Sequence, residues 1–363
     1  MAKNSVLEKF KKLSGNEYSF VMNEEDNPYI IKGMVDTGCY LLNAALCNGN
    51  IYGGLPLGRR VIFGGESGVA KSLLIMYIIK SFLKENEGGN VIFFETEGSS
   101  VIEQADSMKV PKDRILVLPV NTVQDFKIQS TKILGQIKEE QKKGNKEQYL
   151  FVLDSLGMMT TNNEYSQAVD GSEKKDMSKA GEIKSAFRTI TLDLALTNIP
   201  LLIANHTYAN VGGYGNQRVQ SGGSGPVYAG DVLFQITKAK EKEGDSRVGS
   251  LLSLKIQKSR YQIEENVYKL LLLYSKGLWK YSGMLEMALK YDVFKKEGNS
   301  YVVSNDGTKV SKKELYKNAE VYYTKEILDK INEKLMADVG FGQNSNDGVE
   351  GFSGSDDEEG DEC

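Results

Sequence analysis

The middle of the chain alternates between near-continuous apolar runs and amphipathic segments. Apolar runs of five or six residues predict buried strands at residues 60–64, 91–95, 115–119, 149–154 and 200–205. The segments between them predict helices, which begin in the apolar run 73–79 and continue at residues 99–108, 122–143 and 178–197. Fully apolar strands that alternate with helices are typical of a parallel sheet covered on both faces. We therefore predict an α/β fold with a mostly parallel central sheet.

The pattern changes after residue 231. Apolar runs with short polar turns between them predict antiparallel strands added to one edge of the sheet, at residues 232–237, 251–257 and 267–274. A small α+β lobe follows, with a hairpin at residues 299–311 and a last helix at residues 324–336. Ahead of the sheet we expect an amphipathic helix, a strand and a short helix, at residues 4–13, 18–31 and 39–46. The chain thus divides into an N-terminal helix with its linker, a core, a C-terminal lobe and a tail, at residues 1–35, 36–280, 281–337 and 338–363.

Composition narrows the class of protein. The chain has 363 residues, of which 40% are hydrophobic, enough to bury a sizeable core. It has no apolar run of about 18 residues that would predict a transmembrane helix. Its N-terminus has no apolar segment of the kind found in secretory signals, so we expect a cytoplasmic protein. The three cysteines have no metal-ligand spacing and there is a single histidine, so we expect reduced thiols and no structural zinc.

A glycine-rich segment follows the first apolar run and opens the next helix. It matches the P-loop pattern G-x-x-x-x-G-K-[ST] except at Ala70, which stands at the last glycine. Alanine is costly there if the position needs a positive φ, and is accepted if only close packing matters. A P-loop binds phosphates through backbone N–H groups and its lysine, and its hydroxyl holds Mg²⁺. The alternative, a glycine turn that only caps a helix, is disfavoured by the flanking strand and helix. The candidate nucleotide-binding residues are Gly65, Glu66, Ser67, Gly68, Val69, Ala70, Lys71 and Ser72.

Polar side chains follow other predicted strands. Asp154 ends an apolar strand, where an aspartate supports Mg²⁺ in P-loop proteins or, alternatively, caps the next turn. Glu95 and Glu97 end another strand, and a carboxylate there polarises the water that attacks the γ-phosphate. His206 follows a third strand and either senses the γ-phosphate or makes ordinary loop contacts. Because ligands bind at the carboxyl ends of parallel strands, we expect these residues to share one site with the P-loop.

Two connections are long for a compact domain. Residues 157–177 and residues 207–230 both follow strands that end at this site. The second combines many glycines with three tyrosines and one arginine, a composition that suits single-stranded nucleic acid. A glycine-rich lid over the site is the alternative.

The net charge of −4 is unevenly distributed. Residues 338–363 contain nine acidic residues and no lysine or arginine, so removing them leaves +5 on residues 1–337. The composition of this tail predicts disorder. Two interpretations remain open: a solubilising tail, or a tail that competes with nucleic-acid phosphates for the basic surface of the body.

The ordered set of motifs resembles that of the RecA-type recombinases, and within that family the phage UvsX-like branch. The motifs are DTGCYLLNAAL, GGLPLGR, GESGVAKS, VIFFETEG, YLFVLDS, LLIANHT and a Gly-Gly-x-Gly-Pro loop, within about residues 30–337. The resemblance implies a RecA-like P-loop ATPase core and a DNA-dependent ATPase with ATP and Mg²⁺ as cofactors. It implies helical filaments on single-stranded DNA, homologous pairing with double-stranded DNA, and strand exchange in recombination-dependent replication and repair. It further implies a bacterial host cytoplasm and, as partners, a loading mediator and a single-strand-binding protein.

The resemblance also implies roles for residues. Glu97, rather than Glu95, matches the catalytic glutamate, and Asp154 supports Mg²⁺ together with Ser72. His206 matches the position that couples the γ-phosphate to DNA. Lys258 and Arg260 match paired basic residues that reach ATP across the subunit interface. The two long connections match the DNA-binding loops, with candidate DNA contacts at Met177, Lys184, Arg188, Arg218, Gly222 and Gly223.

The remaining segments also have counterparts in the family. The N-terminal helix resembles the polymerisation segment, and acidic tails of this kind act as brakes on duplex binding. Residues 101–104 lack the aromatic side chain that stacks on adenine in cellular RecA, which leaves the nucleotide selectivity open. Two other functions compete with a recombinase: an ATP-gated DNA-coating scaffold or mediator with little turnover, and a RecA-fold helicase that forms closed rings.

Overall fold

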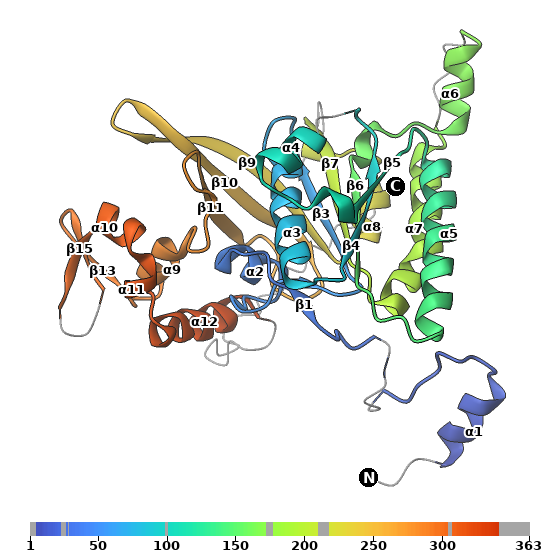
Figure 1. Ribbon diagram of the computed structural model, residues 1–363, viewed down its shortest axis with the longest axis horizontal. Coiled ribbons are helices and arrows are strands. Elements are labelled where there is room, and N and C mark those ends of the chain that lie inside the picture. The colour runs from blue at the N-terminus through green and yellow to red at the C-terminus, as the bar shows by residue number, and fades with distance from the viewer. Residues whose placement is uncertain are drawn as a thin grey trace, which may run out of the picture.

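A ten-stranded mixed sheet forms the centre of the computed structural model (Figure 1). The structure describes residues 5–22, 27, 29–98, 101–171, 177–209, 218–303 and 307–340. The sheet order is β12-β11-β10-β9-β3-β7-β6-β4-β5, and β8 pairs with β7. Six neighbouring strands are parallel: β3 (Arg60–Gly65), β4 (Asn90–Glu95), β5 (Ile115–Pro119), β6 (Tyr149–Asp154), β7 (Leu201–Ala209) and β9 (Val232–Glu243). The predicted parallel sheet is confirmed.

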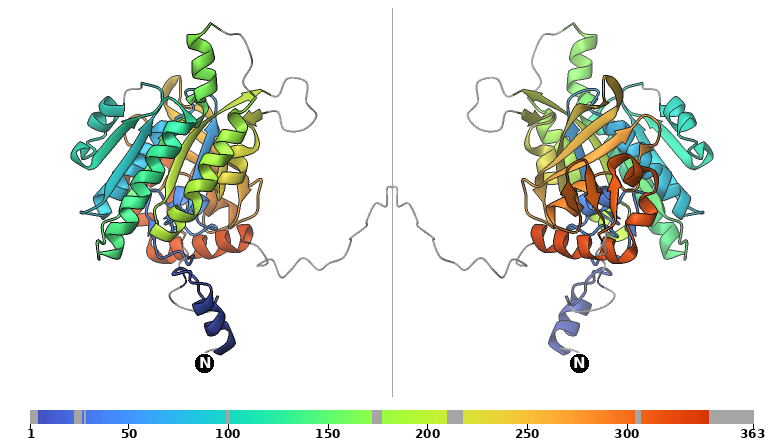
Figure 2. Two further views of the ribbon diagram at one scale, coloured as in Figure 1. Left: turned by 90° about the vertical axis from the view of Figure 1, so that its right-hand side faces the viewer. Right: turned by 90° about the vertical axis from the view of Figure 1, so that its left-hand side faces the viewer.

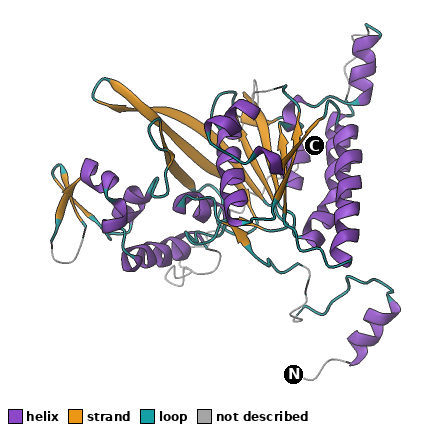
Figure 3. Ribbon diagram, viewed as in Figure 1, coloured by secondary structure: helices purple, strands orange, loops and turns teal. Residues whose placement is uncertain are grey.

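The antiparallel edge is also confirmed, but two of the predicted strands, β9 and β10, are longer than predicted. It contains β10 (Ser246–Ser259), β11 (Val267–Leu273) and β12 (Gly277–Leu278). β9 and β10 extend beyond the apolar runs because the polar residues at the end of β9 pair with those at the start of β10. These polar parts of the two strands form a hairpin that projects from the sheet (Figure 3). The hydrophobic pattern therefore predicts the buried halves of these strands but not their solvent-exposed halves.

Helices cover both faces of the sheet (Figure 2). On one face, α3 (Lys71–Glu85) buries Leu74, Ile78 and Phe82 in the larger core cluster, which α2 (Tyr40–Leu46) joins. On the other face, α5 (Val123–Lys142) and α7 (Lys179–Thr197) form the second cluster around Phe126 and Phe187. The smaller helices of the core are α4 (Val101–Ser107), η1 (Lys112–Arg114), η2 (Leu156–Met158), α6 (Asn162–Val169) and α8 (Ser224–Ala229). No helix in the described ranges is long and apolar enough to span a membrane.

The C-terminal lobe packs against the side of the core that carries α2. It contains α9 (Met284–Lys290), β13 (Lys295–Glu297), β14 (Ser300–Val302), β15 (Lys309–Ser311), α10 (Lys312–Lys317), α11 (Ala319–Tyr322) and α12 (Lys325–Val339). Asn332 on α12 accepts the backbone N–H of Ile51 at 2.8 Å, and Asp329 accepts the hydroxyl of Tyr52 at 2.7 Å. α12 includes Asp338 and the buried Val339, so the folded lobe takes in residues that the sequence prediction assigned to the tail. The other tail residues, 341–363, lie outside the described residues.

The N-terminal segment differs from its prediction in one respect. The amphipathic helix is present as α1 (Ser5–Leu13), which lies apart from the core and exposes Phe10 and Leu13 (Figure 1). The strand predicted at residues 18–31 is wrong, because the described residues there form turns. Side-chain oxygens of Asn16 and Asn27 accept the backbone N–H groups two residues on, which holds these turns. Extended pairing begins later, where β1 (Met34–Val35) pairs with β2 (Leu55–Pro56).

Candidate active site

The glycine-rich segment forms a loop between β3 and α3, as predicted. The Lys71 ammonium lies 3.0 Å from the carbonyl oxygen of Gly65 and 2.8 Å from that of Glu66. Burial lowers the pKa of Lys71, and the carboxylates of Asp154 and Glu97 oppose this shift. The lysine charge is therefore buried inside the loop, near two carboxylates.

Ala70 answers the question that the sequence left open. Its φ is +76° and its ψ is 28°, in the left-handed region, directly ahead of α3. An L-residue with a Cβ is strained there by about 1–2 kcal/mol. The position thus needs the backbone conformation that glycine adopts freely, and this chain pays that cost for an alanine.

Asp154 and Ser72 form the candidate magnesium site. Asp154 ends β6 and is 5% exposed, and burial raises its pKa while a hydrogen bond from Ser72 opposes that shift. A carboxylate and a hydroxyl beside a P-loop are hard oxygen ligands of the kind that Mg²⁺ takes together with phosphate oxygens. The donor set therefore fits the predicted ion, although no group of three or more ligating side chains occurs among the described residues.

The structure separates the two glutamates after β4. The Glu95 carboxylate is 9% exposed and accepts the backbone N–H groups of Glu97 and Gly98 at 2.8 and 3.0 Å. The Glu97 carboxylate instead accepts the Ser155 hydroxyl at 2.6 Å and lies 3.0 Å from Nε2 of His206. Glu95 thus shapes the turn, whereas Glu97 faces the candidate site.

Hydrogen bonds set the charge state of Glu97. Burial by itself raises the pKa of this carboxyl group. The hydrogen bonds from Ser155 and His206 outweigh burial, and the net result is a pKa below the ordinary value. A carboxylate that stays ionised is suited to polarise a water molecule. Ser155, which sequence reasoning did not single out, is therefore part of the site.

His206 lies where the P-loop meets both long connections. It is paired with Gly65 in the parallel register of β7 and β3. Its carbonyl oxygen accepts the N–H of Ser221 at 2.8 Å, and a Cβ on Gly157 would lie 3.1 Å from its ring. His206, whose side chain contacts Glu97, is thus hydrogen-bonded through its backbone to the second connection, residues 207–230. Its ring packs against the beginning of the first connection, residues 157–177.

The second connection has more structure than its glycine content suggests. Residues 218–220 form β8 (Arg218–Gln220), antiparallel to β7, and α8 follows; residues 210–217 lie outside the described residues. Arg218, a predicted DNA contact, forms an ion pair with Glu66 of the P-loop. Lys238 on β9 donates a hydrogen bond to the carbonyl of Gly68 at 2.8 Å. The sequence carried no signal for Lys238, which lies among alternating charged residues of a long strand.

The other predicted DNA contacts lie on two separate elements. Met177 is 81% exposed just ahead of α7. Lys184 and Arg188 are on α7, where Lys184 lies 5.2 Å from the ring centre of Tyr228 on α8. Gly222 and Gly223 have φ values of +84° and +63° and lead into α8. The structure brings Arg218 to the P-loop and places the two α7 cations beside α8.

Lys258 and Arg260 lie at the opposite end of the sheet from the P-loop. Lys258 is paired with Leu233, near the beginning of β9, and the backbone N–H of Arg260 donates to the carbonyl of Asp231 at 3.1 Å. Asp231 in turn accepts the backbone N–H of Arg60, five residues before Gly65 on β3. Lys258 is level with Ile62, three residues before Gly65, since both pair with Leu233. Five residues of strand span about 16 Å, and three residues span about 10 Å. These two cations are therefore separated from the phosphate loop of their own chain.

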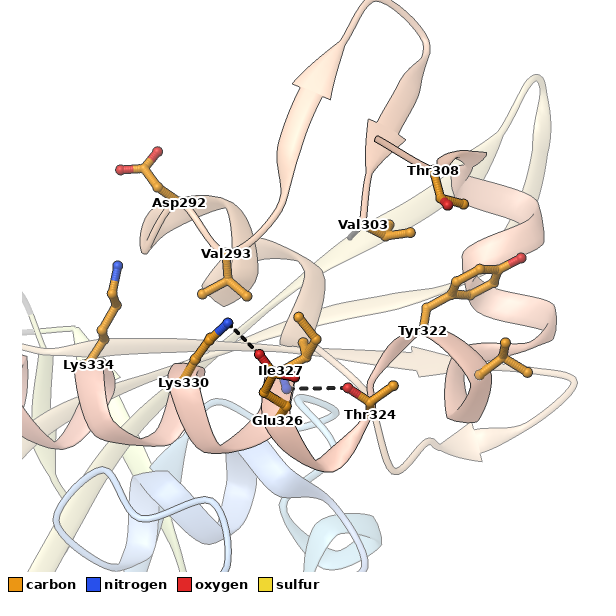
Figure 4. Close-up of a pocket in the computed structure, with 11 residues that line it drawn as sticks. Asp292, Val293, Val303, Thr308, Tyr322, Thr324, Glu326, Ile327, Lys330 and Lys334 are labelled. Atoms are coloured by element: carbon orange, nitrogen blue, oxygen red, sulfur yellow. Dashed lines mark hydrogen bonds and ion pairs between the residues drawn. The ribbon is translucent and has the colours of Figure 1, made fainter. Parts of the chain in front are cut away.

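A pocket of about 520 Å³ occurs in the C-terminal lobe, away from these residues (Figure 4). Lys330 donates to Glu326 at 2.7 Å across its floor, and Lys334 donates to the carbonyl of Tyr291 at 2.6 Å. Three of the charged groups that line this pocket, Glu326, Lys330 and Lys334, are thus hydrogen-bonded within the lobe. The pocket has no part in the nucleotide chemistry of the P-loop.

The sheet and the position of the P-loop are consistent with the predicted RecA-like core, and comparisons with known proteins agree. The chain is 29% identical over 270 residues to the recombination and repair protein of Enterobacteria phage T4, an alignment that covers 74% of this chain and 67% of that protein. It is 25% identical over 335 residues to RecA of Tropheryma whipplei (89% and 70% covered). It is 26% identical over 332 residues to RecA of Phytoplasma mali (87% and 90% covered). No family model matches the chain. The predicted resemblance to RecA-type recombinases, near their phage branch, is confirmed.

Proposed function

We propose that this protein is an ATP-dependent DNA recombinase that assembles on single-stranded DNA as a helical filament and exchanges strands with homologous duplex DNA. The observation that carries the proposal is the position of His206. Its ring contacts Glu97 at the P-loop site, and its backbone is bonded to the connection that includes β8. A change at the γ-phosphate is therefore transmitted directly to a segment that matches a DNA-binding loop.

The chemistry follows from the side chains of the site. Lys71 and the loop N–H groups bind the triphosphate, and Ser72 with Asp154 would hold Mg²⁺, which would supply positive charge to the phosphates. Glu97 orients and polarises the attacking water. Lys258 and Arg260 stabilise the charge that develops on the phosphoryl group of the neighbouring subunit. Hydrolysis releases the contact between Glu97 and His206, and DNA is released with it.

The in-trans role of the basic pair rests on its placement. The pair lies at the end of the sheet opposite to its own P-loop, so it serves a nucleotide bound by another copy. A head-to-tail arrangement of this kind produces an open filament rather than a closed dimer. The tail, with its acidic residues, is proposed to compete with DNA for the basic body, and a loading mediator and a single-strand-binding protein are proposed partners.

The first experiment measures ATP hydrolysis with and without single-stranded DNA over a series of protein concentrations. We expect strong stimulation by DNA that rises cooperatively with protein concentration, because each site is completed by a neighbour. Equal turnover without DNA would contradict the coupling and indicate a different RecA-fold ATPase. Tight ATP-dependent DNA binding without turnover would indicate a scaffold.

The variant Lys71→Ala tests the nucleotide role directly. Loss of a charge-stabilising group at a phosphoryl-transfer site is expected to lower turnover by about 10²–10³ and to abolish ATP-dependent filaments in electron microscopy. Lys80→Ala, an exposed lysine on the same helix, is the matched control. Strand pairing by Lys71→Ala in the presence of ATP would contradict the assignment.

A further inference from the structure

A row of three amide side chains crosses the sheet beneath β8. The side-chain oxygen of Gln220 accepts a hydrogen bond from Asn205 at 2.9 Å. The side-chain nitrogen of Gln220 donates to the side-chain oxygen of Gln257 at 3.0 Å. Asn205 is on β7, Gln220 on β8 and Gln257 on β10, so the row joins the consecutive strands β7 and β8 to a strand 37 residues beyond Gln220.

The position of Gln220 is tightly defined. Its side chain is buried, and its amide lies on Gly64, where an added Cβ would come within 2.2 Å of the amide nitrogen. Gly64 directly precedes the P-loop. Because residue 64 is a glycine, the amide of Gln220 fits against its backbone. The row of amides has no room to shift unless β8 moves as well.

Each end of the row is next to a residue of the proposed catalytic machinery. Asn205 immediately precedes His206, whose ring contacts Glu97. Gln257 immediately precedes Lys258 and lies at a register shift of β10, between the pairs Ile256–Phe234 and Lys258–Leu233. Bulges of this kind re-aim the side chains beside them. A hydrogen bond that holds Gln257 therefore acts on the direction in which Lys258 leaves the strand, together with the hydrogen bond that Lys258 donates to the carbonyl oxygen of Val227 on α8 at 2.5 Å.

One oxygen in the row is left without a partner. Oδ1 of the fully buried Asn205 accepts no hydrogen bond from any described residue, while its nitrogen also donates to the carbonyl of Ser221 at 3.1 Å. Buried polar networks that are only partly satisfied are costly. The unpartnered oxygen of Asn205 therefore lies at the end of the row that is next to His206.

We propose that Gln220 is a positioning residue that couples β8 to the in-trans basic pair, by holding Gln257 and with it Lys258. This inference rests on the proposed function, because it requires that Lys258 and Arg260 act on the neighbour's nucleotide. A change at His206 moves β8 through the bond between Ser221 and His206, and Gln220 passes that movement to Gln257 and, through it, to Lys258. Each subunit thereby links its own nucleotide to the one bound next to it.

The test uses the variant Gln220→Met, which keeps the length of the side chain and removes both hydrogen bonds. We expect its DNA-stimulated turnover to fall roughly tenfold, the factor that corresponds to the loss of one hydrogen bond, here the bond to Gln257 that acts on Lys258. Gln141→Met is the matched control, since Gln141 also joins two elements through its amide, on α5 and α7, but is remote from the site. Thermal melting with and without ATP verifies that both variants fold and bind nucleotide.

Mixed filaments distinguish a role in trans from a local one. Gln220→Met is mixed in equal amounts with Glu97→Gln, which has no active site of its own but presents an intact basic pair. Random mixing at head-to-tail interfaces pairs an intact Glu97 with an intact donor at about one interface in four. We expect turnover of about a quarter of wild type, well above the sum of the two separate proteins. Turnover no greater than that sum would overturn the proposal.

A parallel mixture separates this inference from the function on which it depends. The double variant Lys258→Ala, Arg260→Ala is mixed with Glu97→Gln in the same way. If this mixture regains turnover and the Gln220→Met mixture does not, only the role of Gln220 is overturned. If neither mixture regains turnover, the result contradicts the in-trans role of Lys258 and Arg260. The coupling through Gln220 depends on that role and is then contradicted as well.

Gln257→Met supplies an independent measurement of the same bond. It removes the acceptor for Gln220 at a half-buried position, and it replaces Gln220→Met in the mixtures if that variant does not fold. With both variants in hand, the double variant is expected to lose no more turnover than Gln220→Met alone. Losses that multiply would show that the two residues act separately and would overturn the proposal.

Discussion

The two ends of the central sheet hold their charged residues in different ways. At the P-loop end, Lys71 is held by backbone carbonyls, and Glu97 is held by Ser155 and His206 of the same chain. At the other end, Asp231 is buried against Arg60, yet Arg260, its second partner, is 57% exposed. The first end is organised internally, whereas the second presents a cation to its surroundings. The difference fits the proposed function, in which one subunit contains most of the catalytic site and offers a cation to another copy.

Removing the two cations Lys258 and Arg260 gives the largest expected effect. Replacing Lys258 and Arg260 together by alanine is expected to lower DNA-stimulated turnover by about 10³ or more, the usual contribution of an arginine finger. ATP binding by the separate chain is expected to remain, because neither residue is near its own P-loop. Turnover and nucleotide binding are measured side by side. Lys255→Ala is the control, because Lys255 is a cation on the same strand as Lys258 and pairs with Glu265. Unchanged turnover in the double variant would contradict the proposed role of the second end.

The buried part of the second end is expected to serve stability. Asp231→Ala leaves the Arg60 guanidinium without its partner at a position where both side chains are buried, 2.7 Å apart. Breaking a buried ion pair on one side costs about 3–5 kcal/mol of the free energy of unfolding. Denaturant titration measures the loss. Asp193→Ala breaks the half-exposed pair with Lys138 and is expected to cost only about 0–1 kcal/mol; equal losses would contradict the assignment.

At the P-loop end, pH dependence tests the pairing of Glu97. Its lowered pKa keeps the carboxylate ionised, so activity persists as the pH falls and is lost only below the ordinary range of a glutamate. Ser155→Ala removes a hydrogen bond to the ionised form and is expected to raise the pKa. The acid limb of the turnover–pH profile then moves to higher pH, by about one unit at most. Ser107→Ala, on exposed α4, is the control, and an unmoved limb would exclude Ser155 from the site.

The smallest expected effect concerns the loop backbone. Ala70→Gly relieves the left-handed strain but adds chain entropy to the unfolded state, for a net gain of about 0.5 kcal/mol. Gly68→Ala is the reverse substitution at a comparable position. Gly68 also has a φ of +76°, and nothing lies within 4 Å of an added Cβ. That variant is expected to lose about 1 kcal/mol. Thermal melting compares them, and a loss in Ala70→Gly would show that the methyl group is needed for packing.

The elements that sequence reasoning found share a strong local pattern. The buried strands before the P-loop, before Glu95 and up to Asp154 are apolar along their length, and each was located within a residue of its observed bounds. The turns near Asn16 and Asn27 were mistaken for a strand, since a few apolar residues there resemble a run although the asparagine side chains hold turns. Local patterns therefore identify elements where burial is continuous and fail where single side chains decide the backbone.

Contacts between distant residues account for what was missed at the site. Ser155 contacts Glu97 across 58 residues, and Lys238 contacts Gly68 across 170. Neither is near its partner in the chain, and neither residue type is unusual in its setting. Arg218 was likewise predicted only as a DNA contact, whereas the structure also shows an ion pair between Arg218 and Glu66 of the P-loop.

The sequence by itself determined that this chain has a parallel sheet, a phosphate loop and carboxylates at the carboxyl ends of the strands. These follow from local hydrophobicity and from the short spacing of glycine, lysine and serine, which the chain carries wherever it folds. Only the tertiary structure decided which glutamate faces His206, that Ala70 is left-handed, and that Gln220 joins Asn205 to Gln257. Strand order and register bring those groups together, and long-range packing, rather than any local spacing, sets both.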